Sequence, residues 1–118
     1  MRIISGKYKA KKLNTLKSND TRPTSDKVRE SMFSMLGTIE GDVLDLFGGT
    51  GGLAIEALSR GADSAMIIDG AFDAIKIIKE NASDLDEPVE IYRNDYRRAI
   101  KAMAKREKSF DLIFLGPP

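Results

Sequence analysis

The sequence predicts an α/β fold built on one open parallel sheet with helices on both faces. Four short runs of buried-strand character alternate with helical segments along the chain. Residues 43–58 run from a strand through a glycine cluster into a helix without interruption. Acidic residues stand at or near the carboxyl ends of the strands, the edge at which such sheets bind their ligands.

The composition is that of an ordinary globular domain and excludes several kinds of active site. The chain has 118 residues, enough for one domain, with 42% hydrophobic and 31% charged residues. No apolar run has membrane-spanning length and no signal-peptide core is present, so we expect a cytoplasmic protein without a membrane partner. The sequence contains no Cys and no His, which excludes cysteine nucleophiles, Ser-His-Asp triads and thiolate or imidazole metal sites. No bound metal is expected.

The charge distribution divides the chain into a basic N-terminal arm, residues 1–21, and a body, residues 22–118. Residues 1–29 hold nine Lys and Arg against two Asp, a formal charge of +7, and the remainder carries −6, which gives the chain's +1. A basic arm of this kind suits a polyanionic partner. Charge alone leaves open the alternative of a solvated N-terminus.

The arm and the first helix follow from local signals. Residues 2–13 have short apolar pieces around Gly6, which predicts a small hairpin or extended arm that carries several lysines. Pro23 precedes a helix that Thr24 or Ser25 caps and that ends at Gly37. The expected apolar face of this helix consists of Val28, Met32, Phe33, Met35 and Leu36.

The central stretch combines a buried strand, residues 43–47, with a phosphate- or nucleoside-binding type of turn. Gly49, Gly51 and Ala54 fit the pattern G-x-G-x-x-A. A side chain at either glycine would hold a ligand away from the backbone N–H groups, and a small Ala54 lets the following helix pack close to the strand. This pattern by itself has low specificity.

Asp45 narrows the choice of ligand. A carboxylate near the end of an apolar strand is costly unless a cation or several hydrogen-bond donors meet it. The pyrophosphate of a dinucleotide would be repelled by Asp45, whereas S-adenosylmethionine brings a positive α-ammonium and a positive sulfonium. The alternative is a carboxylate that only ties down its own loop through backbone N–H groups.

The remaining elements alternate regularly. We expect helices over residues 52–59, from about 74 to 81, and over 96–105, and strands over 65–69, 89–93 and 110–115. With the first strand central, the topological switch point falls between the first and fourth strands.

Two further acidic residues fall on the ligand-binding edge. Asp69, 18 residues beyond Gly51, is placed to accept hydrogen bonds from the hydroxyl groups of a ribose, or else to bind the start of the next helix. Asp95 is placed to accept from an adenine amine while the Tyr96 backbone N–H meets a ring nitrogen. Its other role is that of a helix N-cap, and one residue can fill both roles.

These motifs resemble the class I S-adenosylmethionine-dependent methyltransferases, with their Rossmann-like fold, and most closely the RsmD family of 16S rRNA guanine-N2 methyltransferases. The resemblance covers all 118 residues, and its most specific parts are residues 2–7, 22–30 and 45–53. It implies that Asp45, Gly49 and Gly51 hold the methionine end of the cofactor, Asp69 the ribose and Asp95 the adenine. It also implies an rRNA or 30S-subunit partner that the N-terminal arm helps to bind.

The expected site residues form three sets. The cofactor-binding set comprises Asp45, Phe47, Gly49, Thr50, Gly51, Asp69, Asp95 and Tyr96. The RNA-binding set comprises Lys7, Lys9, Lys11, Lys12, Arg22, Thr24 and Arg29. The catalytic set comprises Gly116, Pro117 and Pro118.

The end of the sequence departs from the family pattern. Relatives of this type have Asp or Asn before the two prolines and an aromatic residue after them, and they continue for several more strands and helices; here Gly116 stands at the first position and the chain stops at Pro118. In the family, the Asp or Asn side chain accepts a hydrogen bond from the target amine. Glycine has no side chain that could accept this bond. The alternative function is therefore a catalytically impaired or truncated module that binds cofactor or RNA. The uncovered fourth strand predicts self-association through its edge.

Overall fold

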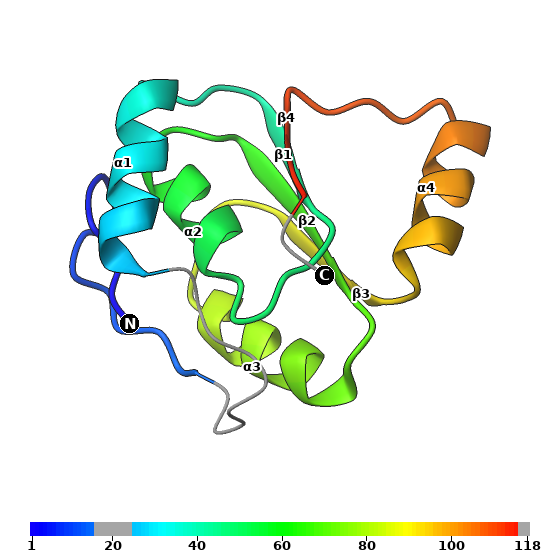
Figure 1. The fold of residues 1–118 in the computed structure, drawn as a ribbon, viewed down its shortest axis with the longest axis horizontal. Helices are drawn as coiled ribbons and strands as arrows, with labels where there is room; N and C mark the ends of the chain where they lie inside the picture. The colour runs from blue at the N-terminus through cyan, green and yellow to red at the C-terminus, as the bar shows by residue number, and fades with distance from the viewer. Residues whose placement is uncertain (16–24, 116–118) are drawn as a thin grey trace.

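The computed structural model of the protein describes residues 1–15 and 25–115. Its sheet has the strand order β3-β2-β1-β4, with all neighbouring strands parallel. The strands are β1 (Asp42–Asp45), β2 (Ser64–Asp69), β3 (Val89–Arg93) and β4 (Leu112–Phe114). The predicted open parallel sheet with a central first strand is confirmed (Figure 1).

Helices cover both faces of this sheet, as predicted. Helices α1 (Asp26–Leu36), α2 (Gly52–Ser59) and α3 (Phe72–Ala82) lie on one face and α4 (Tyr96–Lys105) on the other (Figure 1). Side chains alternate along the strands. Val43 and Ile67 pack with the first three helices, whereas Leu44 and Met66 belong to the cluster that contains Ala99 of α4.

Two strands are shorter than the sequence pattern indicated. Strand β1 ends at Asp45, two residues before the end of the predicted strand, and β4 has three residues where six were expected. Pairing nevertheless continues beyond β1, because the Leu46 N–H donates to the Phe114 carbonyl at 3.2 Å and the Gly48 N–H donates to the Ile68 carbonyl at 3.2 Å. These bonds hold the start of the glycine turn against both neighbouring strands.

The first helix buries only part of the apolar face predicted for it. Ser25 caps it by accepting from the Val28 N–H at 3.3 Å, and Gly37 ends it with a φ of 69°. Val28, Met35 and Leu36 are exposed, with Met35 84% accessible, so the predicted apolar face is wrong in these three positions. The prediction is confirmed for Phe33, which is buried, and for Met32, which packs against the core, and the helix also buries Arg29.

The N-terminal arm forms the predicted small hairpin. Arg2 and Lys12 make an antiparallel bridge, and the Ile3 N–H donates to the Lys11 carbonyl at 3.0 Å. Ile3 and Leu13 pack against Ile55 of α2 in a separate apolar cluster. The described part of the arm therefore lies against the body of the protein.

None of the helices in residues 1–15 and 25–115 combines the length and the apolar character needed to cross a membrane.

Candidate cofactor site at the glycine turn

The buried carboxylate of Asp45 is the chemical centre of the site. The residue is 1% exposed, and its Oδ1 accepts from the Phe47 N–H at 3.1 Å. Its Oδ2 is buried without a hydrogen-bond partner among the described residues. Burial raises the pKa of Asp45 to about 7; the Phe47 N–H acts in the opposite direction, and the negative charge of Asp69 raises the pKa further. Asp45 thus ties down its own loop with one oxygen and leaves the other for a cationic or donor group.

The turn after Asp45 adopts a backbone conformation that favours glycine at two positions. Gly49 and Gly51 have φ values of 58° and 84°, in the left-handed region that favours glycine. A Cβ built at Gly49 would contact nothing within 4 Å, so the space in front of this residue is open to a ligand. Gly51 caps α2, and its N–H donates to the Gly48 carbonyl at 2.7 Å.

Asp69 and Asp95 lie at the same edge, and each has a structural role there. Asp69 Oδ2 accepts from the Gly49 N–H at 3.0 Å, while Oδ1 accepts from the Ala71 N–H at 2.9 Å. Asp95 is the N-cap of α4, with Oδ1 accepting from the N–H groups of Arg97 and Arg98 at 2.9 and 3.3 Å. Because both cap bonds use Oδ1, the cap does not occupy Asp95 Oδ2.

Two aromatic residues of the predicted set meet in space. The rings of Phe47 and Tyr96 lie 5.2 Å apart between centroids at an angle of 47°. Since Phe47 follows β1 and Tyr96 starts α4, the pair joins two elements that are far apart in sequence. Tyr96 directly follows Asp95 in the chain, and Phe47 packs against the apolar cluster under α4.

Thr50 faces away from this edge. Its side chain is buried, and Oγ1 accepts from the Gly52 N–H at 3.2 Å and lies 3.4 Å from the Met1 sulfur. Any contact of Thr50 with a ligand at the turn therefore falls to its backbone.

The side chain of Asn81 holds the backbone of the glycine turn through a hydrogen bond to Thr50. The sequence did not predict this role. Its Nδ2 donates to the Thr50 carbonyl at 2.8 Å and to the Asn14 carbonyl at 3.0 Å, and its Oδ1 accepts from the Asn14 N–H at 2.7 Å. The residue is 3% exposed. An Asn among the inward positions of α3 was the available signal, because a buried amide needs partners.

The arm lysines divide into two groups. Lys7 lies 2.9 Å from Asp86 and 3.4 Å from Glu87, and Lys11 lies 2.5 Å from Asp84. Lys9 and Lys12 are exposed, and within the described ranges neither lies within ion-pair distance of a carboxylate.

The prediction that Arg29 contacts RNA is wrong. Its side chain is fully buried, lies 3.4 Å from Glu56 and donates to Asp26 at 2.9 Å and to the Arg2 carbonyl. Glu56 also accepts from the Ile4 N–H at 2.9 Å. A lone Glu in the otherwise apolar helix at residues 52–59 was the sequence signal for a buried ion pair.

Five of the predicted residues lie outside the described ranges. They are Arg22, Thr24, Gly116, Pro117 and Pro118.

The comparison with known families follows the same motifs. A family model described as Conserved hypothetical protein 95 matches residues 1–118. The chain belongs to this family. "Putative rRNA methyltransferase YlbH" of Bacillus subtilis, a curated relative, is 48% identical over 122 residues, covering 100% of this chain and 66% of that protein. "Ribosomal RNA small subunit methyltransferase D" of Buchnera aphidicola is 35% identical over 122 residues, covering 100% of the chain and 61% of the relative.

A solved structure of a related protein agrees with this family assignment. "Putative methyltransferase yhhF from Escherichia coli" superposes with a TM-score of 0.78 at 28% identity, over 100% of the chain and 64% of that structure. The predicted resemblance to RsmD-type methyltransferases and the Rossmann-like fold are confirmed. The chain spans less than two thirds of the length of these relatives.

Proposed function

We propose that the chain is the cofactor-binding part of an S-adenosylmethionine-dependent rRNA methyltransferase. The observation that carries the proposal is the buried Oδ2 of Asp45, which has no hydrogen-bond partner in residues 1–15 and 25–115, beside a glycine turn with left-handed backbone. A carboxylate in this position suits a ligand that brings positive charge, because a cation within a few ångströms favours the ionised form. S-adenosylmethionine carries two such charges, and a pyrophosphate carries none.

The other residues of the edge suit the rest of this cofactor. Each Asp69 oxygen accepts one backbone N–H, and a carboxylate oxygen has capacity for a second donor such as a ribose hydroxyl. Asp95 Oδ2 is free of the helix cap and suits an adenine amine. Phe47 and Tyr96 would pack beside the bound molecule. The cofactor supplies an activated methyl group on its sulfonium, and these residues of the chain orient it and exclude water.

The proposed substrate is an exocyclic guanine amine of small-subunit rRNA, methylated in the cytoplasm. Support comes from the name of the Buchnera relative and from the positive charge of the arm. Lys9 and Lys12 are exposed for RNA contact, and the exposed ion pair of Lys7 can exchange its partners for phosphates. Arg22 and Thr24 remain proposed contacts. Transfer requires mainly that the amine be held in line with the methyl group.

A second candidate is a module that binds the cofactor or RNA without turnover. Gly116 favours it, because a glycine supplies no side-chain acceptor for the target amine. The rRNA methyltransferase and a module that binds the cofactor share cofactor binding at Asp45, whereas a module that binds RNA alone does not require it.

Calorimetric titration with S-adenosylmethionine tests the shared claim. We expect Asp45→Asn to weaken binding by about tenfold or more, because it removes a charge-assisted contact. Asp42→Asn is the matched control: it makes the same change at the other end of β1, where Asp42 accepts from the Ser64 hydroxyl at 2.5 Å, and should leave the affinity unchanged. Equal affinities for wild type and Asp45→Asn, or tighter binding of NAD than of S-adenosylmethionine, would contradict the proposal.

A further inference from the structure

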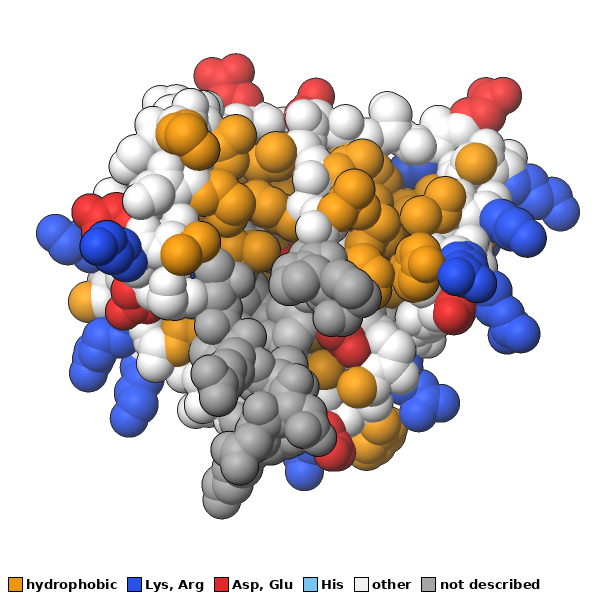
Figure 2. Space-filling model, viewed as in Figure 1, with side chains coloured by type: hydrophobic (Ala, Val, Ile, Leu, Met, Phe, Trp, Pro, Cys, Tyr) orange, Lys and Arg blue, Asp and Glu red, His pale blue; other side chains and the backbone are white. Residues whose placement is uncertain are grey.

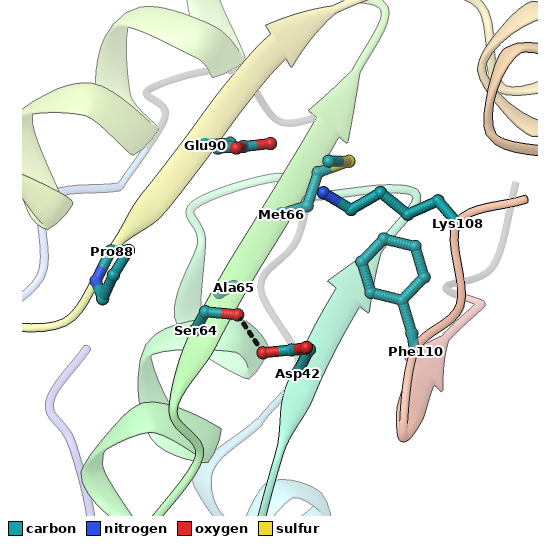
Figure 3. Close-up of a pocket in the computed structure, with 8 residues that line it drawn as sticks. All are labelled: Asp42, Ser64, Ala65, Met66, Pro88, Glu90, Lys108 and Phe110. Atoms are coloured by element: carbon teal, nitrogen blue, oxygen red, sulfur yellow. Dashed lines mark hydrogen bonds between the residues drawn. The ribbon is translucent and has the colours of Figure 1, made fainter. Parts of the chain in front are cut away.

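A groove lies between α4 and strands β2 and β3, on the face of the sheet away from α2. It consists of two adjoining cavities of about 370 and 80 Å³ that share Met66, Glu90 and Lys108. The larger one falls in the size range of small-molecule sites. Figure 3 shows the smaller one, with the Lys108 side chain extending across the sheet toward Met66 and Glu90 on the next strand. We call this feature the α4 groove.

The α4 groove is distinct from the proposed cofactor site. Asp45, Asp69 and Asp95 do not line it; the groove runs along the sheet face and reaches the carboxyl end of β3 at Arg93 and Asn94. Asn94, one residue before Asp95, is the nearest lining residue in sequence to the proposed cofactor contacts.

The floor of the groove is apolar and suits a flat ring. Met66 and Ile68 of β2 are buried, and Ala99 and Met103 of α4 face them in the same cluster. Methionine sulfur makes favourable contacts with aromatic rings. Tyr92, which is 49% exposed, adds an aromatic surface at the side of the groove.

The rim of the groove is positively charged. Arg93, Arg106 and Lys108 line it, and across residues 1–15 and 25–115 none of these three lies within ion-pair distance of a carboxylate. Arg93 and Lys108 lie over the rings of Phe72 and Phe110 at 5.8 and 6.0 Å, contacts that leave the cations able to bind an anion.

The turn at the end of α4 positions two of these three basic residues. Glu107 adopts a φ of 54°, and the Lys108 N–H donates to the Met103 carbonyl at 2.9 Å, which turns the chain back toward the sheet. Arg106 and Lys108 thereby come from a defined turn rather than from a free tail.

The groove also contains two acids: Glu90, which accepts from the Tyr92 hydroxyl at 3.3 Å, and Asp42, at the far end of the smaller cavity, which accepts from the Ser64 hydroxyl. A phosphate would be repelled there, whereas the N–H groups of a base would find an acceptor. The combination of an apolar floor, an internal acceptor and a cationic rim fits a nucleotide whose base enters the groove and whose phosphate stays at the rim.

We propose that the α4 groove binds a nucleotide of single-stranded RNA, as a second RNA contact beside the N-terminal arm. This rests on the proposed RNA substrate. Lys and Arg side chains gather over α4 on one side of the molecule and over α1 and the arm on the other side, so a long RNA can reach both (Figure 2). A free mononucleotide shares the same chemistry, and the experiment separates the two sources.

The test measures fluorescence anisotropy of a labelled single-stranded oligoribonucleotide of about eight nucleotides, without cofactor. We expect the double variant Arg106→Glu, Lys108→Glu to bind about tenfold or more weakly, with the salt dependence of log affinity reduced by about 1.4, or roughly 0.7 for each lost phosphate contact. The matched control is Lys101→Glu, Lys105→Glu, which makes the same change of charge on the same helix outside the groove. Equal losses in both variants would overturn the proposal.

A second pair of variants tests the base position without changing charge. Ala102→Leu fills the groove, whereas Ala104→Leu changes an exposed position of α4 that does not line it. Loss of one base contact should weaken oligonucleotide binding about fivefold for Ala102→Leu only. Unchanged binding by Ala102→Leu would overturn the proposal.

Competitors identify the source of the ligand. Uridine monophosphate and inorganic phosphate should displace the oligonucleotide only at far higher concentration than unlabelled RNA does. Displacement by uridine monophosphate at concentrations comparable to unlabelled RNA would assign the groove to a free nucleotide, and displacement by a decaglutamate peptide at such concentrations would assign it to an acidic protein; either result overturns the RNA assignment. Calorimetric titration with S-adenosylmethionine should be unchanged in all four variants, so failure of the groove is distinguishable from failure at Asp45.

Discussion

At the scale of single residues, the proposed binding of a cationic ligand depends on the protonation state of the Asp45 carboxyl. Burial raises the pKa of this carboxyl to about 7, so much of the free protein holds it uncharged near neutral pH. The folded chain binds this proton more tightly than the unfolded chain does. The stability that Asp45 contributes is therefore largest below pH ~4 and is lost as the pH rises through about 7.

Binding of a cation should reverse this preference and make affinity depend on pH. We expect the affinity of the wild type for S-adenosylmethionine to rise between pH 5.5 and 7.5, approaching about tenfold per pH unit at the acid end, because binding there releases the Asp45 proton. The α-ammonium of the ligand stays largely charged in this window. Calorimetry in two buffers of different ionisation enthalpy measures the released proton directly. Asp45→Asn should show no such release, and an equally steep profile in that variant would assign the pH dependence to another group.

Arg29 shows what a single residue's sequence context leaves undetermined. Its place near a helix start beside other basic residues predicted an exposed contact, yet the side chain is fully buried against Glu56. The arm completes this pair by donating two N–H groups, from Ile4 and Ser5, to Glu56 at 2.9 and 3.2 Å. Since these partners lie more than 50 positions from Glu56, no local pattern contains them.

At the scale of elements, the sequence predicted well what depends on periodicity and chain order. The strands beginning near Val43, Ala65 and Val89 have the expected order, because parallel neighbours and crossovers leave few alternatives. The same geometry placed Asp45, Asp69 and Asp95 on one edge. The buried face of α1 was predicted only in part: Phe33 packs against Phe114 of β4 at 5.7 Å between ring centroids as an apolar residue should, but the burial of Arg29 depends on its contacts with the arm and Glu56, which no local pattern contains.

Three elements meet at Asn81, which connects the arm and α3 to the glycine turn. We expect Asn81→Leu to destabilise the fold by about 1 to 3 kcal/mol, because the buried Thr50 carbonyl and the part-buried backbone groups of Asn14 lose their partners. We also expect weaker S-adenosylmethionine binding, by about threefold or more, because the turn is less fixed. Urea unfolding and calorimetry measure the two effects.

The matched control for this prediction is Asn14→Ala. It keeps the backbone groups that bind Asn81 and removes only the exposed side-chain bond from Asn14 to Glu80 at 3.3 Å. It should change neither quantity appreciably. Normal cofactor affinity in Asn81→Leu would show that the turn keeps its shape without this support.

At the scale of the whole molecule, apolar side chains gather on the face that contains the edge of β4. Met35, Leu36, Ile100, Ile113 and Leu115 are all exposed, and Figure 2 shows hydrophobic groups on this face between α1 and α4. In the described ranges β4 pairs only with β1. Self-association through this edge stays a prediction, and light scattering that found a monomer at all concentrations would contradict it.

Turnover also belongs to the scale of the whole molecule, because a base pocket needs groups from several elements around the bound methyl donor. Methyl transfer from labelled S-adenosylmethionine to under-methylated 30S particles measures it. We expect the 118-residue chain to bind the cofactor yet transfer methyl groups at least about 100-fold more slowly than a version with Gly116→Asp and the C-terminal extension of the Bacillus relative. The same extension with Gly116 kept is the control, since it separates the effect of the side chain at position 116 from that of the additional elements. Equal rates for all three proteins would show that neither the side chain at position 116 nor the additional elements contribute to catalysis.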